Sequence, residues 1–126
     1  MVKRILNLIL IFGLFVFSGC KKNELGGKSG VSGNVLHHGK PIANAVIYIK
    51  FNAKDFPGTD LKVYDTQISA NTNGYFEIFN LYKGDYYFYA VGEDPAISAP
   101  YLVVGGMSVS LKSRERKDID IAVGEE

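Results

Sequence analysis

Apolar and polar residues alternate along residues 74–89, whose sequence is GYFEIFNLYKGDYYFY. Phe76 and Phe88 fall on the apolar side of this alternation, whereas Glu77 falls on the other side. A period of two residues is typical of β-strands that bury one face. The pattern predicts two strands that pair as a hairpin around a short connection, in which Gly84 is free to adopt a positive φ.

Shorter alternating segments predict the other strands, at residues 31–37, 43–51, 63–70, 101–112 and 119–123. The weak alternation of the first is typical of an edge strand. An Asn-Gly pair at 73–74 predicts a second hairpin turn, and the glycine pair at 105–106 predicts a β-bulge. Seven short strands with frequent turn signals, and no helix after residue 19, predict an all-β fold, a single antiparallel β-sandwich.

Residues 1–19 have the layout of a secretory signal peptide. Two basic residues precede an apolar run at 5–17, and two small residues follow it. A helix of that run would be about 20 Å long, which is shorter than the roughly 30 Å hydrocarbon core of a membrane. We therefore expect the segment to be removed rather than to remain as a membrane span.

Cys20 is the single cysteine, so it cannot form an intramolecular disulfide. Residues 17–20, Phe-Ser-Gly-Cys, resemble the lipobox of bacterial lipoproteins. That resemblance implies cleavage before Cys20 and a diacylglycerol on its sulfur, and several acyl chains together anchor a protein stably. Lys21 differs from the aspartate that retains some lipoproteins in the inner membrane, which implies the outer membrane. An uncleaved helix with an incidental cysteine is the alternative.

The rest of the chain divides into a tether and a domain. Residues 20–29 are polar and glycine-rich and show no periodicity, which predicts a flexible tether. The domain is expected at 30–126. Without residues 1–19 the chain has 12 basic and 13 acidic residues. A nucleic-acid-binding protein needs a basic face, so no nucleic acid partner is expected.

Residues 30–92 resemble carboxypeptidase regulatory-like domains in two signatures, GVSGNVLHHGKPIANAVIYIKF and NTNGYFEIFNLYKGDYYFYAVG. The resemblance implies a transthyretin-like, seven-stranded Greek-key sandwich that serves as a non-catalytic accessory module of cell-envelope proteins. Tyr86 follows the turn glycine of the second signature. It is expected to be either a tyrosine-corner residue, with its hydroxyl bonded to nearby backbone, or an ordinary core aromatic residue.

The sequence predicts no catalytic, metal or cofactor site. His37 and His38 are adjacent, so in a strand their rings would point to opposite faces, and no third ligand follows at a metal-site spacing. The acidic residues of the loops show no calcium-ligand spacing; they are Asp55, Asp60, Asp65, Glu93 and Asp94. Transthyretin-like hydroxyisourate hydrolases share a C-terminal Tyr-Arg-Gly-Ser, whereas this chain ends Ala-Val-Gly-Glu-Glu.

The outward positions of two predicted strands carry tyrosines. If Tyr86 faces the core, then Tyr87 and Tyr89 face outward, as do Val46 and Tyr48 of another strand. Tyrosine offers apolar area and a hydroxyl at modest entropic cost, which suits contacts with a sugar or a protein. The alternative is that these rings pair across strands or lie under a loop.

The function expected from these observations is that of a lipid-anchored cell-envelope protein. Its sandwich would present a non-catalytic surface that binds carbohydrate or protein, and it would need no cofactor. A second reading is a structural or assembly subunit that pairs through the edge strand at 31–35. A transthyretin-like hydrolase is a distant third.

Overall fold

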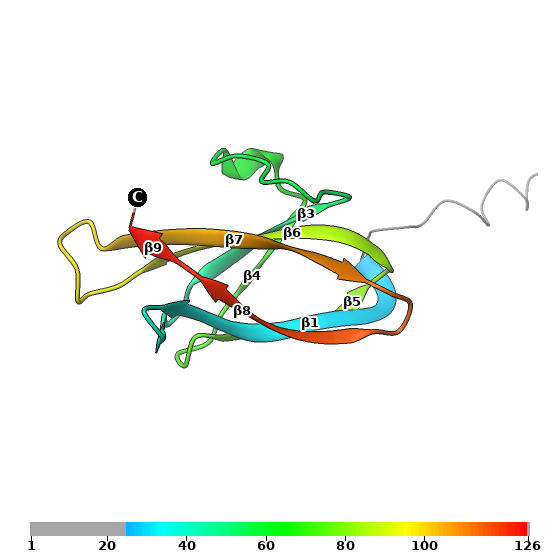
Figure 1. Ribbon diagram of the computed structural model, residues 1–126, viewed down its shortest axis with the longest axis horizontal. Helices are drawn as coiled ribbons and strands as arrows, with labels where there is room; N and C mark the ends of the chain where they lie inside the picture. The colour runs from blue at the N-terminus through cyan, green and yellow to red at the C-terminus, as the bar shows by residue number, and fades with distance from the viewer. Residues whose placement is uncertain (1–24, 126) are drawn as a thin grey trace, which may run out of the picture.

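A computed structural model describes residues 25–125, which form a two-layered all-β sandwich (Figure 1). The predicted fold class is confirmed, and seven of the strands have four residues or more. The elements, in chain order, are β1 (Leu25–His37), β2 (Lys40–Pro41), β3 (Val46–Phe51), the 3-10 helix η1 (Leu61–Val63), β4 (Thr66–Ser69), β5 (Tyr75–Leu81), β6 (Gly84–Glu93), β7 (Leu102–Leu111), β8 (Arg116–Ala122) and β9 (Gly124–Glu125).

The smaller sheet is built around β1. β5 pairs antiparallel with its first part and β2 with its last residues, while β8 pairs parallel with it from Gly30 to Leu36. The prediction that residues 31–37 form an edge strand is therefore wrong, because both sides of β1 are paired. The parallel pair also departs from the antiparallel pairing expected throughout. Its close approach depends on Gly33, whose Cα is the partner of Ile119.

The larger sheet has the order β4-β3-β6-β7-β9, and all its pairs are antiparallel. It forms the second layer of the sandwich, and the loop that contains η1 lies over its outer face (Figure 1). Outward side chains of this sheet follow one another in rows across the strands. One such row joins Val46, Val91 and Val104, and the next joins Tyr48, Tyr89 and Gly106.

The predicted hairpin at residues 74–89 does not form. β5 and β6 are both strands with the predicted inward residues, and Gly84 has a φ of 144°. However, β5 pairs with β1 and β6 pairs with β3 and β7, so the connection crosses from one sheet to the other. The alternation could not reveal this because both sheets of a sandwich have an inward face with the same period.

The predicted turn at residues 71–74 is confirmed, but the prediction that it closes a hairpin is wrong. The Gly74 N–H donates to the Asn71 carbonyl, and the Asn71 side chain accepts from the backbone N–H groups of Asn73 and Tyr75. The strands on either side, β4 and β5, lie in different sheets. The Asn side chain thus stabilises a reversal between layers rather than between paired strands.

The glycine pair in β7 produces no bulge. Gly105 and Gly106 continue the register with β6 without a shift. A Cβ on Gly105 would lie 2.1 Å from the Ala122 carbonyl oxygen, so this glycine permits β8 to approach the end of the sheet. The irregular register occurs in β1 instead, between Leu25 and Val31.

The expected tether ends earlier than predicted. β1 begins at Leu25, and Ser29 is buried, with its hydroxyl donating to the Lys112 carbonyl at 2.6 Å. The glycines that suggested a linker serve close packing, since a Cβ on Gly27 would lie 2.2 Å from the Leu81 carbonyl oxygen. The expected signal peptide, Cys20 and residues 20–24 lie outside the described residues. Within residues 25–125 no helix is long and apolar enough to cross a membrane.

Inward side chains of both sheets form the core. The largest fully buried side chains are Tyr86, Phe76, Phe88, Ile47 and Ile49. Tyr86 donates its hydroxyl to the Tyr82 carbonyl at 2.6 Å, four residues upstream. Burial raises its pKa to about 12, although that hydrogen bond partly opposes the shift. The structure therefore decides in favour of the tyrosine-corner reading.

Candidate functional site

Five aromatic rings gather on the outer face of the larger sheet, and we call them the aromatic cluster: Tyr48, Phe56, Tyr64, Tyr87 and Tyr89. Tyr64 stacks on Tyr89 with the ring centroids 5.8 Å apart and also meets Tyr48 at 6.0 Å. Phe56 lies 5.7 Å from Tyr87 and 5.3 Å from Tyr89. Phe56 and Tyr64 belong to the loop between β3 and β4, so this loop covers the tyrosines of the sheet.

Several hydrogen bonds hold that loop in place. The Tyr64 hydroxyl donates to the Gly58 carbonyl at 2.9 Å, and burial raises its pKa to about 12, with smaller contributions from the neighbouring tyrosines Tyr89 and Tyr87. Asp60 accepts the Lys62 N–H at the start of η1, and Asp65 accepts the Phe51 N–H at 2.7 Å. The loop is therefore a fixed cover over part of the sheet.

The predicted interaction face is divided by this cover. Tyr89 is only 5% exposed, so it lies under the loop, as in the alternative reading of the sequence. Tyr48 is half-buried against Tyr64. Tyr87 is also half-buried but lines an open hollow of about 280 Å³ together with Phe56, Thr59, Tyr89, Val104, Gly105 and Gly106. We call this the loop hollow.

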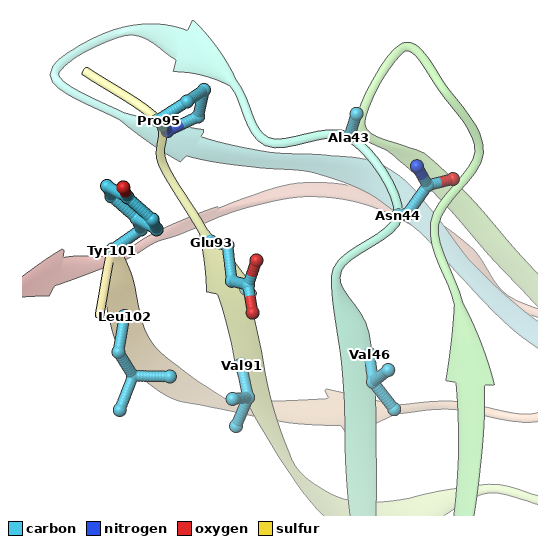
Figure 2. A pocket seen from close by; sticks show the side chains of 9 residues that line it. Ala43, Asn44, Val46, Val91, Glu93, Pro95, Tyr101 and Leu102 are labelled. Atoms are coloured by element: carbon cyan, nitrogen blue, oxygen red, sulfur yellow. The ribbon is translucent and has the colours of Figure 1, made fainter. Parts of the chain in front are cut away.

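Val46 belongs to a different depression, which we call the end hollow. It has a volume of about 440 Å³ and is lined by Ala43, Asn44, Val46, Val91, Gly92, Glu93, Pro95, Tyr101 and Leu102. Figure 2 shows the Glu93 carboxylate projecting between β6 and β3, with Tyr101 and Pro95 on one side and Asn44 on the other. The floor is apolar and formed by outward valines of the sheet.

The end hollow combines polar groups without partners and an exposed ring. Among residues 25–125, neither the Glu93 carboxylate nor the Asn44 side-chain amide makes a hydrogen bond or ion pair. Tyr101 is 42% exposed. Asn44 and Tyr101 both have positive φ angles, of 61° and 66°. Among residues 25–125 the same conformation occurs at His38, Asn52 and Arg114, so it is not particular to the hollow.

Asp94 holds the Tyr101 side of the hollow in position. His37 Nδ1 lies 2.5 Å from Asp94 Oδ2, and both side chains are almost completely buried. The other oxygen of Asp94 accepts the Ala96 N–H, and its own backbone N–H donates to the Tyr101 carbonyl at 2.7 Å. The β6–β7 loop is therefore tied both to itself and to the end of β1.

These bonds predict a loss of stability in acid. The hydrogen bond from His37, then that from the Ala96 N–H, holds the Asp94 pKa below its ordinary value of 3.8. A carboxyl group whose pKa is lower in the folded protein stabilises the fold at pH values above its pKa in the unfolded chain. This stabilisation is lost as the pH falls through its pKa in the folded protein. We expect the melting temperature to decrease as the pH is lowered below about 4, and to decrease less steeply in Asp94→Asn. Identical acid profiles for the two proteins would contradict this role.

No group of three or more potential metal ligands occurs within residues 25–125. His37 is buried against Asp94, whereas His38 is exposed at the following turn. Of the loop acids, Asp60 and Asp94 accept backbone hydrogen bonds from residues two positions further along the chain, and Asp65 accepts the Phe51 N–H at the end of β3.

Sequence reasoning missed most of the end hollow. Glu93 follows the outward alternation of β6 two residues after Val91, which is a signal that the sequence contains. Asn44 and Tyr101 fall inside the predicted strands at 43–51 and 101–112, but β3 begins at Val46 and β7 at Leu102, so both residues lie in connections, where periodicity does not indicate which residues meet. Phe56, in the loop before η1, gave no signal that it would cover the tyrosines.

Comparison with known proteins supports the fold. Neither a protein-family model nor a curated protein sequence matches the chain. A solved structure from Pseudomonas aeruginosa, of a proposed carbohydrate-binding protein, is similar with a TM-score of 0.58 and 12% identity, over 79% of this chain and 91% of that one. A DUF3823 family protein from Parabacteroides merdae has a TM-score of 0.46 and 16% identity, over 78% of this chain and 46% of that one. The resemblance to carboxypeptidase regulatory-like domains stays a prediction.

Proposed function

We propose that this protein binds carbohydrate without catalysis, and that the sugar occupies the end hollow. The observation that carries the proposal is the combination of an exposed aromatic ring, Tyr101, with the unpaired carboxylate of Glu93 and amide of Asn44 over an apolar floor. Binding sites of this kind place a few polar groups around a mostly apolar depression.

The chemistry of a sugar matches these groups. One face of a pyranose ring exposes C–H groups, which pack against an aromatic ring, while the hydroxyls at its edge need hydrogen-bond partners. Tyr101 supplies the ring. Glu93 accepts hydrogen bonds from hydroxyls, and a charged acceptor makes stronger bonds than a neutral one. The Asn44 amide both donates and accepts, which suits a hydroxyl in either role.

A further observation agrees with this proposal, and another weakens its rival. The similar structure from Pseudomonas aeruginosa is itself a proposed carbohydrate-binding protein. The rival reading, assembly through a free edge at residues 31–35, loses its basis because β1 is paired on both sides.

The proposal includes the cell envelope as the location. Cys20 would carry the lipid and hold the domain at the membrane, where extracellular or envelope glycans are available. Residues 21–24 then provide a short link to β1. Mass spectrometry of the mature chain extracted from membranes should find acyl chains on Cys20, and a bare thiol on a soluble chain would refute this part.

A glycan array probed with the full chain in detergent tests the binding itself. We expect selective binding to neutral oligosaccharides, and a loss of about tenfold or more in affinity in Tyr101→Ala, which removes the ring, and in Glu93→Gln, which replaces the charged acceptor with a neutral one. Tyr75→Ala and Glu77→Gln are matched controls, since these residues lie on the outer face of the other sheet. Equal binding by all four variants, or no binding to any glycan, would refute the proposal.

A further inference from the structure

The end hollow and the loop hollow lie next to each other on one face of the larger sheet. Val91 lines the first and Val104 lines the second, and these two residues are direct partners in the β6–β7 register. On β7, Leu102 and Val104 are successive outward positions, about 7 Å apart. The β6–β7 register therefore places the linings of the two hollows side by side at this row.

Each hollow presents one exposed aromatic side chain. Tyr101 is 42% exposed at the end hollow, and Phe56 is 50% exposed at the loop hollow. The Phe56 ring packs against the rings of Tyr87 and Tyr89, and these contacts fix its position. Rigid aromatic rings lose little entropy on binding, which makes them effective contact surfaces.

Glycine keeps the floor of the loop hollow open. A Cβ on Gly106 would lie 2.7 Å from the Tyr87 ring and 2.5 Å from the Phe88 carbonyl oxygen. The Tyr87 ring can therefore lie low over β7 instead of being pushed outward by a neighbouring side chain. The result is an apolar surface bounded by Phe56, with Thr59 as a hydroxyl at its rim.

The two hollows differ in chemistry. The end hollow contains the free carboxylate and amide, whereas the loop hollow is apolar apart from Thr59 and the tyrosine hydroxyls. The outward positions from Tyr87 to Glu93 are six residue steps apart on β6, or about 20 Å, which exceeds the size of one sugar ring. A single ring would thus occupy only one part of the surface.

We infer that the ligand is an oligosaccharide that spans both hollows. One sugar unit is fixed in the end hollow by Glu93, Asn44 and Tyr101, and later units of the same chain lie over Val104 and pack against Phe56. This inference rests on the proposed function and adds the ligand class, a linear chain of several units. Specificity comes from the end hollow, and length dependence comes from the loop hollow.

The test compares affinity with ligand length. Gluco-, manno-, xylo- and chito-oligosaccharides of one to six units are titrated by calorimetry into the full chain in detergent. We expect affinity to rise with length by roughly two- to tenfold, the contribution of one aromatic contact, and then to level off. Phe56→Ala should abolish this rise while leaving the affinity for the shortest ligand that binds unchanged.

A matched control separates this effect from general loss of aromatic surface. Phe79→Ala removes an aromatic ring on the outer face of the other sheet, where Arg116 lies over it at 4.4 Å, and should leave the length dependence intact. Equal affinity for all lengths would overturn the inference while leaving the end hollow as the site, whereas an equal loss at every length in Phe56→Ala would overturn it by placing the first unit at the loop hollow. Absence of binding to every oligosaccharide would overturn the proposed function as well.

Discussion

Gly33→Ala is expected to destabilise the domain by about 3 kcal/mol, the upper part of the range for overpacked interiors, or to prevent folding. A Cβ at this position would lie 1.5 Å from the Ile119 carbonyl oxygen and 2.6 Å from its carbonyl carbon. Both atoms are backbone, so no side-chain rotation relieves the clash. β8 would have to move away from β1 along the parallel pair. Urea unfolding followed by circular dichroism measures the change.

Gly124→Ala is the matched control for this substitution. An added Cβ at Gly124 meets no atom within 4 Å, and its φ lies outside the region that favours glycine. Its free energy of unfolding should stay within about 0.5 kcal/mol of the wild type, as for ordinary surface changes. If Gly33→Ala were as stable as Gly124→Ala, the close β1–β8 pairing would be wrong.

Phe88→Ala should cost about 3–5 kcal/mol, because it removes a large buried ring and leaves a cavity. Phe88 is fully buried at the centre of β6 and meets Phe76 of the opposite sheet with ring centroids 6.3 Å apart. The loss therefore falls on the contact between the two layers. Thermal and urea denaturation, taken together, measure it.

The comparison with Phe56→Ala makes this prediction specific. Phe56 is half exposed and lies outside the core, so its truncation should cost less than about 1 kcal/mol. The two substitutions remove the same side chain from the same protein. A similar loss of unfolding free energy in both variants would mean that the aromatic cluster contributes as much to stability as the core. That result would contradict the difference in burial between Phe56 and Phe88.

Alternation identified which side chains of β5 and β6 face inward, but not which strands they pair with. Phe76 and Phe88 both point into the core as expected, although they come from opposite sheets. An inward face is a local property of the chain, with a period of two in either layer. Pairing depends on contacts between residues distant in sequence, such as β1 with β8, which no local pattern records.

Glycines were misinterpreted for a related reason. The glycines at 26–27 suggest a linker and those at 105–106 suggest a bulge, yet Gly27 and Gly105 lie where a Cβ would strike backbone. A glycine that permits close packing and a glycine that permits flexibility are the same letter in a sequence. Only the position of the neighbouring strand distinguishes them.

The sequence by itself determined the all-β class, the inward residues of the main strands, the buried position of Tyr86 and the expectation of a lipid anchor at Cys20. These follow from period, turn chemistry and short motifs, which are local. The tertiary structure alone decided that a loop covers Tyr89 and that Asn44, Glu93 and Tyr101 meet around one hollow. Asn44 and Tyr101 lie in separate connections and Glu93 ends β6, so their meeting depends on how the strands pair and where each loop returns.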